Sequence, residues 1–163
     1  MSSADQHLSG FSEEKVPIGE AYRIAIIVSE WNTAITERLY QGCYNTLLKF
    51  RVKQENIFTY YVPGSFELPQ AAQMVLESSE LDAVICLGCI IKGETDHDKY
   101  IAHAVAQGVM QVSTEYSTPV AFGVLTTDTE AQALDRCGGK YGNKGDEAAV
   151  TALKMAALRE KLI

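Results

Sequence analysis

The sequence predicts an α/β domain in which helices cover both faces of a parallel sheet, and three observations support this prediction. Short runs of β-branched and aromatic residues alternate with segments whose apolar residues recur at helical spacing. Two of these runs are almost continuously apolar, as expected for strands buried on both faces. The 163 residues fit one domain, and 47% of them are hydrophobic, which is enough for a sizeable core.

The predicted strands are four short runs rich in β-branched or aromatic residues. They are Arg23–Ser29, Asn56–Val62, Ala83–Ile91 and Pro119–Leu125. The first and third are the two almost continuously apolar runs. Because helical segments separate the strands, the chain should form βαβ units, and right-handed crossovers leave few topologies for the sheet.

Five helices are expected between and after these strands. They are Thr33–Phe50, an apolar stripe over Leu68–Leu76, and segments at about Asp98–Tyr116, Asp128–Arg136 and Asp146–Lys161. In the first of them an apolar residue recurs at every fourth position from Ile35 to Leu47. Thr127 and Glu130 have the spacing of a capping box for the short fourth helix.

The first 21 residues precede the first strand and form an N-terminal extension to a single domain over residues 22–163. Met1–Lys15 is polar and slightly acidic. It lacks the apolar stretch of a signal peptide and the Arg-rich bias of a transit peptide, so a cytoplasmic location is the simplest interpretation. The extension is expected to be either loose or docked on a neighbouring subunit.

Charge and hydropathy argue against two classes of partner. The net charge is −7 and the Lys and Arg residues form no cluster, which is the opposite of what a nucleic-acid binder requires. No apolar run approaches the roughly 20 residues of a membrane helix. An anionic ligand would therefore depend on a few local cations and backbone amides.

Cys86 and Cys89 form a C-x-x-C pattern, which can indicate a zinc or thiol redox site. Both lie in the predicted strand Ala83–Ile91. Side chains three residues apart on a strand point to opposite faces, so the two sulfurs cannot share a metal. We interpret them as packing residues and expect no metal site.

Ligands of open α/β sheets bind at the carboxyl ends of the strands, so the segments that follow the strands carry the functional prediction. They are Glu30–Asn32, Pro63–Glu67, Lys92–His97 and Thr126–Thr127. These segments concentrate aromatic, acidic and glycine residues along one rim of the predicted sheet. The coincidence predicts a binding site there.

Each residue of the first two segments also has a structural interpretation. Trp31 can stack on a planar ligand ring or simply cover the core. Phe66 can equally belong to the core, and Gly64 after Pro63 is most simply a turn. Taken alone, Glu67 is better explained as a partner of the helix dipole than as a ligand-binding group.

The segment Lys92–His97 is more informative. Gly93 allows close approach of the backbone to a ligand, and Thr95 can cap the following helix. Free N–H groups at the start of a helix form an anion site, and His97 lies in that first turn. His97 is therefore a candidate for proton transfer, although a lone histidine is more often structural or solvated.

A glycine-rich connector, Gly138–Gly145, is flanked by Arg136 and includes Lys144. No predicted strand precedes it, so it matches neither a phosphate-binding Walker loop nor a dinucleotide fingerprint. By itself the connector is best explained as a helix–helix turn with C-cap glycines and an arginine that compensates the helix dipole.

Taken together, these segments resemble the lumazine synthase family, from about Arg23 to the last helix. The motifs that carry the resemblance are Trp31-Asn32, Val62–Pro69, Leu87–His97, Phe122–Thr127, and Arg136 followed by Asn143-Lys144-Gly145. Any one of them is weak, but five in order with family-like spacing are specific.

The resemblance implies a flavodoxin-like three-layer fold, assembled as homopentamers or as icosahedral shells of twelve pentamers. It implies a transferase of riboflavin biosynthesis with two small-molecule substrates, 5-amino-6-(D-ribitylamino)uracil and 3,4-dihydroxy-2-butanone 4-phosphate. The reaction requires no metal or redox cofactor. Riboflavin synthase is the protein partner that the resemblance suggests.

The resemblance also implies an active site between adjacent subunits. Its residues would be Trp31, Asn32, Ser65, Phe66, Glu67, Cys89, Ile90, Ile91, Glu94, Thr95, His97, Phe122, Arg136 and Lys144. Trp31 would stack on the pyrimidine, Glu67 would receive ribityl hydroxyls, and His97 would transfer protons. The backbone at Glu94 and Thr95 would bind phosphate. Phe122, Arg136 and Lys144 would come from the neighbour, with Arg136 also on the phosphate.

Three positions depart from the common pattern of the family. Trp31 stands where many members have Phe, which preserves an aromatic face. Lys92 replaces a frequent arginine, and Cys89 stands where small polar residues are common. These departures leave the detail of the pocket open.

Rival assignments fit less well. A flavodoxin-type electron carrier needs a phosphate loop after the first strand, whereas Ser29–Thr33 contains no glycine. A response regulator needs an aspartate at the end of the third strand, where Cys89–Ile91 offers none. The motifs are also closer to lumazine synthase than to archaeal-type riboflavin synthase. A non-catalytic flavin-binding or shell-forming homologue remains the alternative from a different functional class.

Overall fold

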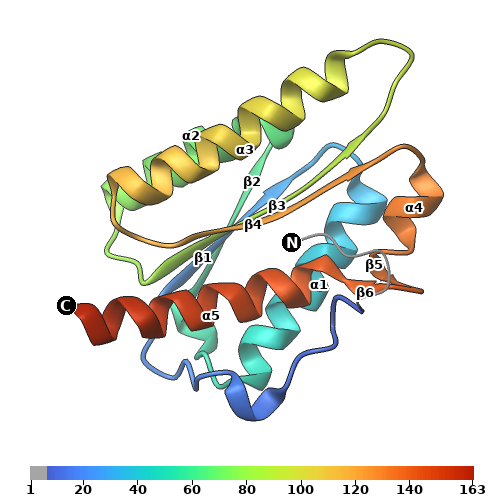
Figure 1. Cartoon of the computed structure of the whole chain (residues 1–163). Helices are drawn as coiled ribbons and strands as arrows, with labels where there is room; N and C mark the ends of the chain where they lie inside the picture. Colours follow the sequence, from blue (N-terminus) through green and yellow to red (C-terminus); the bar gives the residue numbers. More distant parts are fainter. Residues whose placement is uncertain (1–6) are drawn as a thin grey trace.

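Four parallel strands form the central sheet in the order β2-β1-β3-β4 (Figure 1). They are β1 (Ile24–Ser29), β2 (Ile57–Val62), β3 (Ala83–Ile91) and β4 (Val120–Thr127). The computed structural model describes residues 7–163. The four strands coincide with the predicted runs apart from one or two residues at their ends.

Helices cover both faces of the sheet, which confirms the predicted three-layer architecture (Figure 1). α1 and α5 pack on one face, while α2 and α3 pack on the other. The helices are α1 (Thr33–Lys49), α2 (Leu68–Ser78), α3 (His97–Glu115), α4 (Glu130–Leu134) and α5 (Lys144–Leu162). Three short 3-10 turns are η1 (Glu13–Lys15), η2 (Gln54–Asn56) and η3 (Ser65–Glu67).

Alternation along the strands divides the core into two clusters. Ile24, Ile26 and Val28 of β1 pack toward α1 and α5, whereas Ala25 and Ile27 pack toward α2 and α3. The strand β3 is buried on both faces in the same way, as its continuous apolar run predicted.

The cysteines of β3 behave as packing residues. Cys86 belongs to the cluster beneath α2 and α3, and Cys89 belongs to the cluster beneath α1 and α5. Both are buried and unpaired by disulfides. Within residues 7–163 no group of three or more His, Cys, Asp or Glu side chains is arranged to hold a metal ion.

The helices α1 and α5 cross at unusually short range because small residues lie at the contact. A Cβ atom added at Gly145 would overlap the carbonyl oxygen of Leu39, and one added at Gly42 would overlap the side chain of Asn143. Ala148 and Ala149 are buried beside this crossing. The close approach fixes the start of α5 relative to the rim of the sheet.

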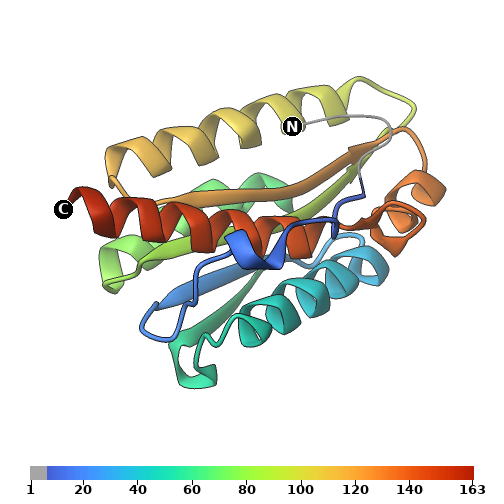
Figure 2. The same ribbon diagram turned by 60° about the horizontal axis from the view of Figure 1, so that its bottom comes forward.

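The N-terminal segment, from His7 to Tyr22, packs on its own chain. In Figure 2 it runs across α5 toward the short hairpin that precedes this helix. Val16 is buried, the rings of Phe11 and Phe50 lie 6.0 Å apart, and Gly19 N donates to Phe50 O at 2.8 Å. The apolar side chains of this segment therefore find partners within the chain. Met1–Gln6 lies outside the described residues.

The glycine-rich connector forms a small antiparallel hairpin of β5 (Cys137–Gly139) and β6 (Gly142–Asn143), so the expectation of a plain helix–helix turn was wrong. Gly138 and Gly142 have φ angles of 106° and 83°, which allow the chain to reverse within a few residues.

The helix α4 begins two residues later than the capping-box pattern predicted. Its N-cap is Thr129, whose hydroxyl accepts from Gln132 N at 3.2 Å. The Gln132 side chain in turn accepts from Asp128 N at 2.8 Å. A reciprocal cap therefore exists, but Thr127 and Glu130 do not form it.

No helix in the part of the chain that the structure describes combines the length and the apolar character needed to cross a membrane.

Candidate active site

The loops at the carboxyl ends of the strands form a connected rim. Glu30 N donates to Val62 O at 2.8 Å, and Trp31 N donates to Pro63 O at 3.1 Å. The Asn32 side chain donates to the carbonyl oxygen of Cys89 at 2.9 Å. The loop after β1 is therefore tied to the loop after β2 and to the end of β3.

Asn32 has a left-handed backbone conformation, with a φ angle of 63°. Asparagine tolerates this conformation better than most residues, and here its amide also bridges to β3. The left-handed turn reverses the chain between β1 and α1 and presents Trp31 away from the sheet.

Two aromatic side chains of the rim project from the subunit. Trp31 is 73% exposed and Phe66 is 60% exposed. Neither ring covers the core of its own chain, so the structural interpretation of these residues does not hold within one subunit. Their faces are open to a planar ligand or to a second subunit.

Ser65 and Glu67 follow β2 in the turn η3. Ser65 is buried, its hydroxyl has no hydrogen-bond partner among residues 7–163, and it packs against the space that a side chain at Gly88 would occupy. Glu67 is half-buried at the start of α2. A buried hydroxyl without a hydrogen-bond partner costs free energy. A polar ligand that formed a hydrogen bond with Ser65 would remove this cost.

The segment Lys92–His97 is exposed and leads into α3. The N-cap is Asp96 and its side chain makes no capping bond, so Thr95 does not cap the helix as expected. The carboxylate of Asp96 pairs instead with Lys99 at 2.7 Å. Lys99 N already donates to Asp96 O at 3.1 Å, so the N–H groups of Asp98 and of His97, the first residue of α3, are those available to solvent or an anion.

The end of β3 passes beneath the rim. Cys89 and Ile90 are buried, and Ile91 is half-buried. Burial raises the pKa of the Cys89 thiol to about 12, so this group is neutral at ordinary pH. Because its side chain packs into the core, Cys89 can contribute to a pocket only through its backbone.

The remaining predicted site residues come from β4, from the segment after α4 and from the start of α5. Phe122 lies on β4 opposite Cys86 and is 36% exposed. Arg136 donates to the carbonyl oxygen of Gln132 at 2.9 Å. Lys144 pairs with Glu147 at 2.7 Å and is largely buried, so its charge is already compensated within the chain.

The predicted residues fall into two sets. Trp31 and Phe66 follow β1 and β2, whereas Arg136 and Lys144 flank the hairpin between α4 and α5, which packs on α1. Phe122 precedes the end of β4 at Thr127 by five residues, or roughly 16 Å along a strand. Among residues 7–163 no hydrogen bond or ion pair joins Trp31 or Phe66 to Arg136 or Lys144.

Two hollows of the described chain do not join these sets. A cavity of about 290 Å³ lies at the rim between α3 and α4, where Ile90, Asp98 and Thr127 are among its lining residues. A larger hollow, of about 750 Å³, lies between the N-terminal segment and α1 and contains none of the predicted residues. Size alone therefore does not locate the chemistry, and we give more weight to the rim.

Tyr141, in the turn of the hairpin, is a residue that the sequence did not single out. Its ring lies 4.7 Å from the guanidinium carbon of Arg136. The only signal in the sequence was its place within the glycine-rich connector, where the hairpin itself was not predicted.

The fold and the rim together define a class, namely three-layer α/β proteins that bind ligands beyond the carboxyl ends of a parallel sheet. Comparison with known proteins narrows this class. Residues 21–160 match the family model described as 6,7-dimethyl-8-ribityllumazine synthase.

Curated proteins with that name are similar to nearly the whole chain. The protein from Cytophaga hutchinsonii is 52% identical over 157 residues, which cover 96% of this chain and 98% of the relative. The protein from Porphyromonas gingivalis is 51% identical over 158 residues, covering 97% and 98%. The protein from Flavobacterium psychrophilum is 42% identical, covering 99% and 85%. The chain belongs to the 6,7-dimethyl-8-ribityllumazine synthase family.

Proposed function

We propose that this chain catalyses the lumazine synthase reaction, in which 5-amino-6-(D-ribitylamino)uracil and 3,4-dihydroxy-2-butanone 4-phosphate give 6,7-dimethyl-8-ribityllumazine, phosphate and water. The match to the family over residues 21–160 is the observation that carries this proposal. Nothing in the rim or the comparisons favours a non-catalytic homologue. We also propose that the protein is cytoplasmic.

The active site forms between two adjacent subunits of a cyclic homo-oligomer, which we propose is a pentamer, alone or within a shell of twelve pentamers. Trp31 and Arg136 come from separate segments, one after β1 and one after α4, and no hydrogen bond or ion pair joins them among residues 7–163, which supports this arrangement. A head-to-tail contact repeated around a ring places one edge of each subunit against the other edge of its neighbour. The exposed rings of Trp31 and Phe66 then gain a covering surface.

Each set of residues has a distinct task in this site. Trp31 stacks on the pyrimidine, and Glu67 receives hydroxyl groups of its ribityl chain. Arg136 of the neighbour and the first amides of α3 bind the phosphate of the second substrate, because charge-assisted hydrogen bonds suit a dianion. The net charge of −7 makes these local donors more necessary.

The chemistry then proceeds largely through proximity. The pyrimidine amine condenses with the ketone, phosphate departs, and the ring closes with loss of water. Holding the two substrates in contact supplies most of the acceleration. His97, the first residue of α3, transfers protons between the reacting atoms. Riboflavin synthase, which consumes lumazine, is the protein partner that we propose.

Activity is tested directly by incubating the purified protein with both substrates and following lumazine fluorescence. A folded, assembled protein that produces no lumazine would support the non-catalytic alternative. The two-subunit site requires a second experiment, with both substrates well below their KM values. Trp31→Ala and Arg136→Ala subunits are prepared separately, and each should form an assembly with about a tenth of wild-type activity or less.

When the two variants are unfolded, mixed at equal input and refolded, activity should return. In a randomly mixed ring about a quarter of the interfaces pair an intact Trp31 with an intact Arg136, by simple probability for a two-chain site. The recovered activity should approach that fraction of wild type. Mixed assemblies without recovery, identified by mass spectrometry, would mean that each site lies within a single chain.

A further inference from the structure

The guanidinium of Arg136 is held by two contacts within its own chain. One of its terminal nitrogens donates to the carbonyl oxygen of Gln132 at 2.9 Å. The guanidinium also lies over the Tyr141 ring, with 4.7 Å between its carbon and the ring centroid. A hydrogen bond and a cation–π contact together restrict the position of the group.

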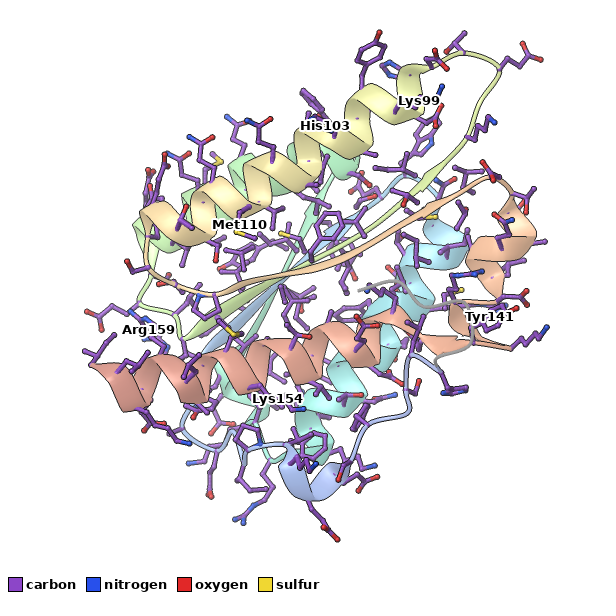
Figure 3. The ribbon with its side chains drawn as sticks, viewed as in Figure 1. Lys99, His103, Met110, Tyr141, Lys154 and Arg159 are labelled. Carbon is purple, nitrogen blue, oxygen red and sulfur yellow. The ribbon has the colours of Figure 1, made fainter. Side chains whose placement is uncertain are left out.

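Tyr141 is fixed by its backbone rather than by its side chain. Its N–H donates to Asp135 O at 2.8 Å, and its carbonyl oxygen accepts from Leu8 N at 2.7 Å. Figure 3 shows Tyr141 in the hairpin beside α4, on the segment that links α4 to α5. The second of these bonds brings the N-terminal segment directly to the residue that supports Arg136.

A further contact holds the same hairpin. Asn143 N donates to the hydroxyl of Ser9 at 2.9 Å, and the Asn143 side chain caps α5 by accepting from Gly145 N at 2.8 Å. It also donates to Arg38 O at 2.9 Å. Because Asn143 is buried, its N–H would be left without a partner if the Ser9 hydroxyl were removed.

The hairpin also gathers a second cation. The ammonium of Lys140 lies 5.0 Å from the centre of the same Tyr141 ring. In a chain with a net charge of −7, two positive groups thus lie near one aromatic ring of the hairpin.

We propose that Tyr141 is a positioning residue for phosphate recognition, and that Leu8 and Ser9 of the N-terminal segment fix it in place. The inference rests on the proposed function, because it requires Arg136 to bind the phosphate of the butanone substrate. It adds a task for the N-terminal segment, which keeps the hairpin in the conformation that presents Arg136 to the neighbouring subunit.

The test is steady-state kinetics on full-length Tyr141→Ala and Tyr141→Phe. Loss of the ring should raise KM for the butanone phosphate by about two- to fivefold, the size of an exposed cation–π contact. The inhibition constant of inorganic phosphate should rise by the same factor, whereas KM for the pyrimidine should not change. Tyr141→Phe retains the aromatic face and should match wild type.

Two serine variants test the N-terminal segment. Ser9→Ala should raise KM for the butanone phosphate and the inhibition constant of inorganic phosphate, as Tyr141→Ala does. The reason is that the hairpin loses the hydrogen bond from Asn143 N to the Ser9 hydroxyl. Ser12→Ala is the matched control, since Ser12 is exposed and its side chain makes no capping bond. Ser9→Ala also keeps the proposal testable if Tyr141→Ala assembles poorly.

Several outcomes would overturn the inference. Wild-type phosphate parameters in Tyr141→Ala would do so, as would an equal rise of KM for both substrates, which indicates a purely structural role. A shift in Tyr141→Phe as large as in Tyr141→Ala would also contradict it. The double variant with Arg136→Ala should be no worse than Arg136→Ala alone, since Tyr141 acts through Arg136.

Arg136→Ala separates this inference from the proposed function. If it raises KM for the butanone phosphate while Tyr141→Ala has no effect, only the positioning role fails. If Arg136→Ala leaves that KM unchanged, the phosphate role given to Arg136 in the proposed function fails, and the positioning role falls with it.

Discussion

The candidate site has two edges that present their residues in opposite ways, an apolar edge after β1 and β2 and an ordered hairpin edge between α4 and α5. At the apolar edge, Trp31 and Phe66 are exposed and contribute nothing to the core of their own chain. At the hairpin edge, Arg136 lies over the Tyr141 ring and is hydrogen-bonded, and Lys144 is paired with an acid. In the proposed assembly a neighbouring subunit would cover the apolar edge, whereas the cations of the hairpin edge are already held by contacts within their own chain.

The largest effect should come from the ordered edge. Arg136→Ala should lower kcat/KM for the butanone phosphate by about a hundredfold, since two charge-assisted hydrogen bonds at ~1.5 kcal/mol each amount to that factor. Affinity for the pyrimidine should barely change. Steady-state kinetics with each substrate varied in turn measure the contrast. An equal fall in kcat/KM for both substrates would favour a structural role for Arg136. The phosphate would then not be assigned to the hairpin edge.

His97 belongs to neither edge and is the first residue of α3. His97→Ala should slow turnover by about a hundredfold, the low end for general acid–base assistance, because proximity survives its removal. The variant should remain assembled and measurably active. His103→Ala is the control, since His103 is also exposed on α3 but lies further from the rim (Figure 3). Wild-type turnover in a folded His97→Ala protein would exclude His97 from the mechanism.

A smaller effect is expected at the apolar edge. Trp31→Ala should raise KM for the pyrimidine by about tenfold, as loss of one aromatic stacking partner costs about 1–3 kcal/mol. Trp31→Phe should stay close to wild type, because it keeps an aromatic face. KM for the butanone phosphate should not change. If Trp31→Ala instead changed only KM for the butanone phosphate, the assignment of the pyrimidine to the apolar edge would be wrong.

The smallest effect tests whether the hairpin edge is as well ordered as its contacts indicate. Cys137 of β5 is buried, and burial raises the pKa of its thiol. Because the thiolate is the reactive form, Cys137 should resist alkylation by iodoacetamide at pH 8 in the native protein and react readily after unfolding. Peptide mass spectrometry measures the extent. Rapid labelling of the native protein would show that the hairpin opens enough to expose Cys137.

The sheet could be predicted from sequence because its signals are strong and local. The apolar runs of β1 and β3 and the four-residue repeat of α1 leave little ambiguity, and their ends fall within about two residues of the expected positions. The hairpin β5–β6 could not be predicted in this way. Its strands have three and two residues, too few for an alternating pattern. The cap of α4 was displaced because both Thr127 and Thr129 can start such a motif.

The residues of the candidate site differ in the same way: some could be predicted from local signals in the sequence and others could not. Trp31, Glu67 and His97 follow strands, so the rule for parallel sheets places them at the rim without further knowledge. Phe122 lies within a strand and Arg136 beyond a short helix, and only the family resemblance pointed to them. Tyr141 escaped notice because its stacking on Arg136 depends on the fold of the hairpin. Contacts made across a chain reversal leave no periodicity in the sequence.

The close crossing of α1 and α5 has an evolutionary consequence. Gly145 stands next to Lys144 and near the hairpin, so invariance at this position in a collection of relatives would suggest a part in catalysis. The crossing gives a different cause, because any side chain at Gly145 would collide with the main chain of Leu39. Selection would remove such variants for failing to fold, before their activity mattered. A glycine that never varies beside a candidate site can therefore be required for the close packing of two helices rather than for catalysis.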